Sequence, residues 1–136
     1  MFLKPLNTDE EKIAFLEVAH ALIPLDNQFS EFEKNLINDF KFEMSFDKDF
    51  EPWNIKNIED INPFLDVLKN REKEVLIGLL IELVALAKIN MEYSEKEMEF
   101  INYIANYWNL KEKLPYIEDW VEQYLNLIRD LNYIFS

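Results

Sequence analysis

The sequence predicts an all-α protein in which two helical hairpins and a C-terminal helix surround one central apolar helix. Three observations lead to this prediction. Residues 75–87 are apolar at eleven of thirteen positions, helix-capping motifs recur along the chain, and the 136 residues include one glycine. A scarcity of glycine disfavours β-hairpin turns and glycine-rich phosphate loops. The length and the 49% hydrophobic content suit a single helical domain, residues 1–136, with one core.

The central helix is expected from about Glu72 to Ile89. A helix that is apolar on every face belongs inside a protein, and its apolar run is shorter than the roughly 20 residues that span a membrane. Gly78 lies in its interior, where glycine costs about 1 kcal/mol relative to alanine. We therefore expect another helix to approach closely over Gly78.

Glu82 is the one charged residue of the apolar run. A buried carboxylate must be paired, hydrogen-bonded or protonated. We expect a structural ion pair with Arg71, Lys88 or Arg129, and we favour this over a functional role for Glu82.

Two capping boxes, in which Ser or Thr is followed three residues later by Glu, start the helices of the first half. The box at 8–11 predicts a helix from Asp9 to about Ile23, where Pro24 ends it. The box at 30–33 predicts a helix to about Met44. The inward-facing residues of this second helix should be Phe32, Leu36, Ile37 and Phe40.

Residues 45–63 carry two prolines and several Asn and Asp, which indicates a connection with one short helix near residues 55–61. Pro63 suits the first turn of the helix that follows.

The second half begins its hairpin with a third capping box, at 94–97, which predicts a helix to about Leu110. Pro115 opens the last helix. Apolar residues at helical spacing predict one inward face for it: Ile117, Trp120, Val121, Tyr124, Leu125, Ile128 and Leu131.

The chain aligns with itself at an offset of 64 residues. Residues 21–33 then lie on 85–97, so that the second and third capping boxes coincide. We interpret this as an internal repeat, 10–47 and 74–111, that forms two pseudo-symmetric helical hairpins. The alternative is that any two helix–turn–helix units share capping boxes.

This pattern resembles the TerB-like domain of tellurite-resistance proteins, most clearly over 70–112 and more weakly over 10–47. The resemblance implies a helical fold with an acidic, glycine-containing turn ahead of the capping box, where metal binding has been suggested. In the first copy Asp26 matches the acid and Asn27 replaces the glycine. The second copy has neither. The resemblance therefore implies at most a metal site at Asp26 and Glu33, within a stress-response domain.

The formal net charge is -13, and over half of it falls between residues 26 and 66, with eleven acids and four lysines. Such a chain lacks the basic footprint that nucleic acid binding requires. Aromatic residues interleave with these acids, as in a surface that captures a basic protein. The alternative is a solvated acidic face over ordinary core aromatics. The candidate partner-binding residues are Asp47, Asp49, Phe50, Glu51, Trp53, Glu59 and Asp60.

The residues that enzymes use are scarce. There is no cysteine, so disulfides and thiolate metal sites are excluded. His20 is the one histidine, lies beside an apolar stripe and has no second histidine nearby, which favours a core or boundary position. Residues 26–37 fail the spacing of a calcium-binding EF-hand loop. We expect no enzymatic activity, no cofactor and no bound metal.

Together these patterns predict a non-enzymatic acidic helical binding protein that masks a basic protein partner. Bacterial immunity proteins neutralise a cognate toxin in this manner. The alternative is the TerB-like stress-resistance role, with metal at Asp26. The N-terminal residues lack the long apolar segment of a signal peptide, so we expect a cytoplasmic protein that contacts no membrane.

Overall fold

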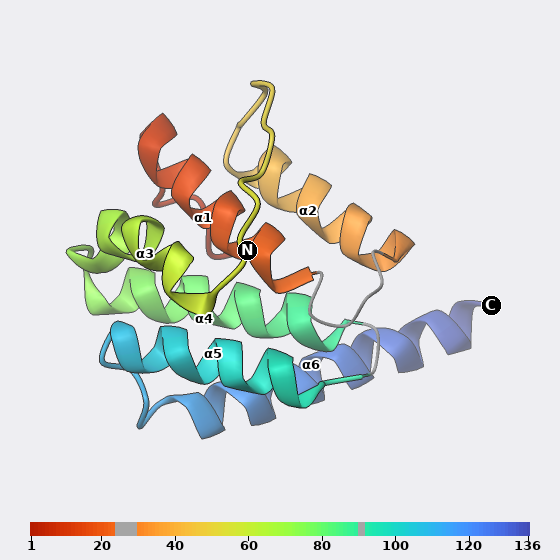
Figure 1. Cartoon of the computed structure of the whole chain (residues 1–136). Coiled ribbons are helices and arrows are strands. Elements are labelled where there is room, and N and C mark those ends of the chain that lie inside the picture. The colour runs from red at the N-terminus through yellow and green to blue at the C-terminus, as the bar shows by residue number, and fades with distance from the viewer. Residues whose placement is uncertain (24–29, 90–91) are drawn as a thin grey trace.

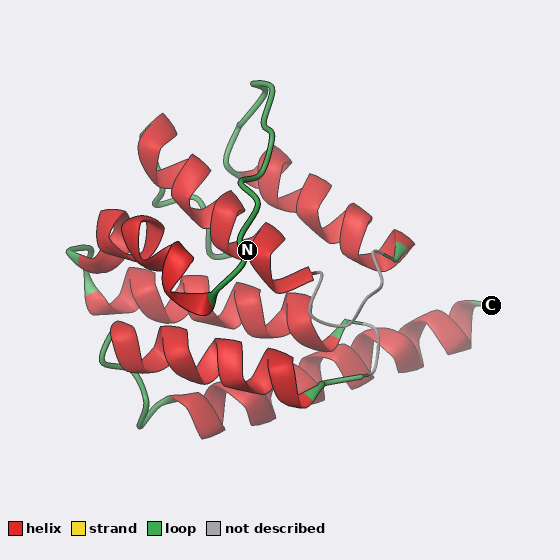
Figure 2. Ribbon diagram, in the orientation of Figure 1, coloured by secondary structure: helices red, strands yellow, loops and turns green. Residues whose placement is uncertain are grey.

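The chain folds into helices and connecting loops throughout the part that the computed structural model describes, which is residues 1–23, 30–89 and 92–136 (Figure 2). No strand occurs in that part, so the all-α prediction is confirmed. In chain order the elements are α1 (Asp9–Leu22), α2 (Glu31–Glu43), the 3₁₀ helix η2 (Ile58–Ile61), α3 (Asn62–Lys69), α4 (Lys73–Lys88), α5 (Glu95–Tyr107) and α6 (Leu114–Phe135).

The apolar helix α4 lies at the centre of the molecule, as its sequence predicts. Helices α1 and α3 pack together on one side of it, and α5 and α6 lie on the other (Figure 1). Helix α2 packs on the outer side of α1, where the rings of Phe15 and Phe40 meet edge to face with centroids 5.4 Å apart. Four consecutive inward positions of α4 are inaccessible to solvent: Leu79, Leu80, Leu83 and Val84.

The predicted capping boxes start α2 and α5. The Ser30 hydroxyl accepts from the Glu33 amide at 3.1 Å, and the Glu33 carboxylate accepts from the Ser30 amide at 2.9 Å. Ser94 and Glu97 repeat both bonds. Each pair satisfies amide groups that a helix N-terminus otherwise leaves unbonded. Thr8 caps α1 in the same way, but Glu11 turns its carboxylate to Arg71, 2.7 Å away.

The local structure repeats at the offset of 64 residues seen in the sequence. Helices α2 and α5 each have 13 residues and begin and end 64 residues apart. Each is followed by a residue with positive φ, Ser45 at 54° and Asn109 at 60°. The next amide then bonds back, Phe46 to Lys41 and Leu110 to Ala105. This is the Schellman ending of a helix. A twofold relation between the whole hairpins stays a prediction.

The two residues that interrupt the apolar run of α4, Gly78 and Glu82, contact other partners than those predicted. A Cβ atom on Gly78 would lie 2.7 Å from the Cβ of Phe2, so the close approach is real but comes from the N-terminal segment and not from a helix. The expected ion pair of Glu82 with Arg71, Lys88 or Arg129 is wrong. Glu82 instead lies 3.5 Å from the Met1 amino group, which also pairs with Glu43.

Several side chains that we expected to face inward are exposed. Phe32 is 65% exposed because it lies on the outer face of α2. On α6, Trp120, Ile128 and Leu131 are 44%, 39% and 51% exposed, while Val121 stays buried. Helical spacing identifies an apolar stripe, but the neighbouring helices cover only part of its width and length. The short helix of the connection is also smaller than expected, a single 3₁₀ turn at Ile58–Ile61.

The two left-handed residues give a matched test of backbone strain. A left-handed conformation costs a non-glycine residue about 1–2 kcal/mol, and asparagine tolerates it better than most. We expect Ser45→Gly to raise the free energy of unfolding by about 1 kcal/mol and Asn109→Gly to raise it less. Urea unfolding followed by circular dichroism measures both. A loss of stability in both variants would contradict the Schellman assignment.

The contact between Gly78 and Phe2 gives a second test. We expect Gly78→Ala to lower the free energy of unfolding by about 1–2 kcal/mol, because overpacking against Phe2 outweighs the helix propensity of alanine. In a chain that also carries Phe2→Gly, the same Gly78→Ala change should be neutral or stabilising. The double-mutant cycle isolates the contact. Stabilisation by Gly78→Ala in the unaltered chain would refute it.

Candidate partner-binding surface

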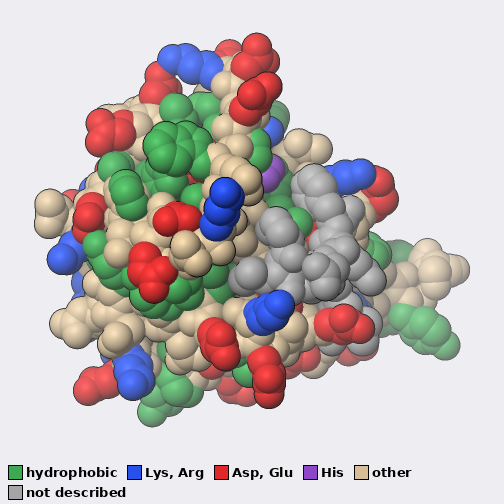
Figure 3. Space-filling view, in the orientation of Figure 1, with side chains coloured by type: hydrophobic (Ala, Val, Ile, Leu, Met, Phe, Trp, Pro, Cys, Tyr) green, Lys and Arg blue, Asp and Glu red, His purple; other side chains and the backbone are tan. Residues whose placement is uncertain are grey.

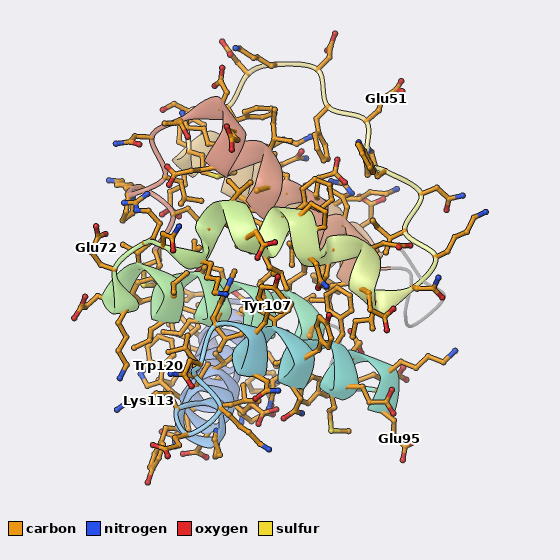
Figure 4. All side chains as sticks on the ribbon, turned by 60° about the vertical axis from the view of Figure 1, so that its left-hand side comes forward. Glu51, Glu72, Glu95, Tyr107, Lys113 and Trp120 are labelled. Carbon is orange, nitrogen blue, oxygen red and sulfur yellow. The ribbon has the colours of Figure 1, made fainter. Side chains whose placement is uncertain are left out.

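The connection between α2 and η2, residues 45–57, holds most of the predicted partner-binding residues, and we call it the acidic loop. It rises above α1 and α2 and forms the top of the molecule in Figure 1. Asp and Glu side chains gather at its tip in the space-filling view (Figure 3). Glu51, labelled in Figure 4, points away from the helices into solvent.

Aromatic residues fix the start of the acidic loop to the helices. Phe46 is 7% exposed and packs in the core, and its ring meets that of Phe50 edge to face at 6.5 Å. Phe50 is half-buried and lies 5.2 Å from the ring of His20 on α1. Phe50 therefore offers a partner only part of its ring, and its contacts hold the loop in place. Burial lowers the pKa of His20, which agrees with its predicted boundary position.

A buried carboxylate holds the second half of the acidic loop. Glu17 on α1 is 2% exposed and accepts a hydrogen bond from the backbone amide of Trp53 at 3.0 Å. Burial raises the pKa of Glu17, and the Trp53 bond opposes that rise. No sequence motif marks Glu17, although a glutamate between Leu16 and Val18, on a helix face of apolar residues, is a signal of a buried acid.

Trp53 is the large apolar side chain that this loop presents to solvent. Trp53 is 69% exposed, and its indole contacts the ring of Phe64 of α3 with centroids 5.7 Å apart and planes at 89°. The hydrogen bond from its backbone amide to Glu17 positions its backbone. These two contacts restrict the indole before any partner arrives, which lowers the entropy cost of binding.

The five predicted acids are all exposed, but they differ in what they contact. Asp47, Asp49, Glu51 and Glu59 lie on the surface. Asp60 accepts hydrogen bonds from the Lys56 and Asn57 amides at 3.1 and 3.0 Å and starts η2. Those two bonds lower the pKa of Asp60. Asp60 therefore contributes charge but is also structural.

One lysine of the acidic loop is neutralised from within the molecule. Lys48 pairs with Asp9 at the start of α1, and this bond is the main cause of the lowered pKa of Asp9 and the raised pKa of Lys48. The pair joins the tip of the loop to α1. It leaves the neighbouring Asp47 and Asp49 to define the outward charge of the tip.

The arrangement suits recognition of a positively charged surface. Carboxylates on a projecting loop attract a basic protein from a distance, and an exposed indole can be desolvated at the centre of the contact. Tryptophan faces also attract Lys and Arg side chains directly. The loop therefore combines long-range charge with one short-range anchor.

The alternative prediction of a metal site names Asp26 and Glu33. Asp26 lies outside the described residues. Glu33 is 1% exposed, and its carboxylate serves the capping box of α2. Within residues 1–23, 30–89 and 92–136, no group of three or more His, Asp or Glu side chains is arranged to hold a metal ion. The same ranges contain no helix that is both long enough and apolar enough to cross a membrane.

A shallow open depression lies on the outer side of α5. It is lined by Glu95, Met98, Glu99, Asn102, Tyr103, Asn106 and Lys111. It includes none of the seven predicted partner-binding residues.

Glu17 provides a test of how the acidic loop is held. Glu17→Ala leaves the Trp53 amide without its acceptor, and we expect a loss of about 1–3 kcal/mol of unfolding free energy. Glu17→Gln keeps an acceptor oxygen and should keep most of that stability. Hydrogen exchange of the Trp53 amide, measured by NMR, should be fast in the alanine variant and slow in the glutamine variant. Equal exchange in both would show that the bond does not hold the loop.

The stability that Glu17 contributes depends on pH, and Glu17→Gln compared with the unaltered chain measures this. Because the pKa of Glu17 is raised in the folded chain, the folded state keeps a proton that the unfolded chain releases near the ordinary value of 4.5. The contribution of Glu17 to stability is therefore greatest at low pH and falls as pH rises through the folded pKa. We expect Glu17→Gln to gain stability relative to the unaltered chain over that range. Parallel curves from pH 4 to pH 8 would contradict the shift.

The comparisons with known proteins leave the family open. No protein-family model, no curated protein and no solved structure matches this chain. The resemblance to the TerB-like domain, drawn from the capping boxes and the apolar helix, therefore stays a prediction.

Proposed function

We propose that this chain is a non-enzymatic binding protein that masks a basic protein partner, in the way that an immunity protein neutralises a cognate toxin. The observation that carries the proposal is the acidic loop with its 69% exposed Trp53, whose backbone amide is bonded to Glu17. The partner contacts it with a basic surface that covers the indole.

Charge supports a partner of this kind. The net charge of -13 repels nucleic acid and other acidic molecules, while it speeds the approach of a basic protein. Carboxylates on an exposed loop are screened by salt over about 8–10 Å, so association should slow as the salt concentration rises. Masking requires only that the bound loop cover the partner's basic surface, and it needs no chemistry from this chain.

Packing supports a central role for Trp53. Tryptophan is enriched among the few residues that carry most of the free energy of protein association. Its backbone bond to Glu17 and its ring contact with Phe64 are already made in the free chain. The surrounding acids Asp49 and Glu51 then act mainly on the rate of association and on the choice of partner.

The proposal is tested by finding and then measuring the partner. The chain is used to capture proteins from its native host at low and moderate salt, and the retained protein is identified by mass spectrometry and purified. We expect a basic protein that binds stoichiometrically. Trp53→Ala should weaken the measured affinity by about tenfold or more, mostly through faster dissociation. Asp49→Lys with Glu51→Lys should slow association and reduce its dependence on salt.

A matched control changes net charge by the same amount elsewhere. Glu99 and Glu112 are exposed and lie on α5 and in the loop before α6. Glu99→Lys with Glu112→Lys should leave dissociation unchanged and should slow association much less than the loop variant. Equal effects of the two double variants would show that only the overall net charge matters and not its place on the acidic loop. Unchanged affinity in Trp53→Ala would show that Trp53 is not the anchor. Equal binding of unrelated basic proteins would overturn masking of a specific partner.

A further inference from the structure

The last part of α6 lies outside the core. Its buried residues are Leu114, Ile117, Val121 and Leu125, and among residues 126–136 none is buried. The reason is length, since α6 has 22 residues and its neighbour α4 has 16. In Figure 1 the end of α6 projects beyond the other helices. A helical segment without tertiary packing is marginally stable in water, so apolar residues there call for a partner.

A stripe of large apolar side chains runs along α6 beside its buried face, and we call it the α6 seam. Its members are Trp120, Tyr124, Leu127, Leu131 and Ile134. They are spaced by four, three, four and three residues, the repeat that keeps one seam along a helix facing a second helix. Four of them are 44%, 67%, 51% and 72% exposed, and Tyr124 is half-buried. The rings of Trp120 and Tyr124 stack on each other at 5.4 Å.

The charges of α6 leave this seam clear. The acids Glu118, Asp119 and Glu122 fall at helix positions outside it, and Glu122 pairs with Lys88 of α4. Asp130 borders the seam on the same edge as Gln123, whose side-chain amide donates to Asp119 of the same helix at 2.9 Å. In a chain of net charge -13, an acid-free apolar stripe is where two copies approach with least repulsion. A basic partner, by contrast, finds no carboxylate on it.

We propose that the α6 seam is the interface of a homodimer, in which the α6 helices of two copies pack antiparallel. With the helices reversed, Trp120 meets Leu131 of the second copy and Tyr124 meets Leu127 of the second copy. Each bulky ring then lies opposite a smaller side chain, which suits close packing across a twofold axis. Gln123 lies near Asp130 of the second copy, and none of the five seam positions carries a carboxylate.

The exposed area is sufficient for such a dimer. The seam and the flanking Ile128 and Phe135, which are 39% and 80% exposed, leave on the order of 600 Å² of apolar surface per copy. Two copies would bury at most about 1,200 Å², which is the lower end of the size range of specific interfaces. The acidic loop lies on the far side of the molecule from α6 (Figure 1). The dimer therefore leaves both loops accessible, and the inference does not depend on the proposed function.

The test is the mass of the full chain in solution. Sedimentation equilibrium from about 5 μM to 500 μM should give twice 16.4 kDa at the upper concentrations. Leu127→Asp with Leu131→Asp places charge on the seam at two exposed positions and should give 16.4 kDa throughout, with an unchanged helical circular dichroism spectrum. A monomeric unaltered chain, or a dimer that survives both substitutions, would overturn the proposal.

The control variant carries the same added charge on the same helix. Asn126 and Tyr133 are exposed and lie outside the seam. Asn126→Asp with Tyr133→Asp should therefore leave the dimer intact, and loss of the dimer in this variant would contradict the seam as the interface. If the unaltered chain is monomeric and instead sediments with phosphatidylcholine vesicles through Leu127 and Leu131, the seam is a lipid-binding face and the dimer is wrong.

Orientation is tested by disulfide cross-linking, because the chain has no cysteine of its own. A mixture of Trp120→Cys and Leu131→Cys chains should form the mixed disulfide on mild oxidation, as antiparallel packing requires. Efficient self-cross-linking of each variant alone, without the mixed product, would indicate parallel helices and overturn the register.

Discussion

The need to bury α4 dictates how the other elements of the fold are arranged. A helix that is apolar on every face gains free energy of about 25 cal/mol for each Å² of apolar surface removed from water, so other elements must enclose it. Helices α1 and α3, helices α5 and α6, and the N-terminal segment together do so. Gly78 lets Phe2 lie directly on the helix, and Glu82 on the same helix finds the Met1 amino group. The N-terminal segment is thus part of the core and not an appendage.

The side chains of the acidic loop divide into apolar ones that pack on the helices and acidic ones that face solvent. Its apolar side chains Phe46 and Phe50 turn inward onto α1, and Glu17 holds the backbone at Trp53. Its acids turn outward. A loop that crosses the surface in this way can be held without regular secondary structure, because its rings pack on the helices and a buried carboxylate accepts one of its backbone amides. The indole of Trp53 is the exception, because it is apolar and yet exposed, and this makes it the candidate binding residue.

The two surfaces of the molecule differ in chemistry and in position. The acidic loop is charged and has one aromatic anchor, whereas the α6 seam is apolar and free of carboxylates. The acidic loop suits attraction of a partner over a distance, and the α6 seam suits close packing against a second copy. A dimer through α6 would present two acidic loops on one assembly. Two loops on one particle would strengthen binding to any partner that offers two basic sites at a matching separation.

The helices are predictable from the sequence, because their starts and ends depend on residues that are close together in the chain. Ser30 with Glu33, Ser94 with Glu97, and Pro115 each specify a helix start through local bonds or a fixed φ. The apolar character of every face of residues 75–87 likewise predicted that α4 is central. Of the candidate site, the sequence indicated which residues are acidic or aromatic, and therefore that residues 45–60 are unusual.

How those residues are used depends on contacts between distant parts of the chain. Whether an aromatic ring is buried depends on distant neighbours. Phe50 meets His20 and is half covered, while Trp53 and Phe32 find no neighbour that encloses them. Glu17 became the acceptor for Trp53 through a contact 36 residues away, and Glu82 paired with an amino group 81 positions earlier in the chain. Apolar spacing gives the direction of a helix face, but the length and placement of the neighbouring helices decide how much of that face is covered. For α6 this leaves its last turns in solvent.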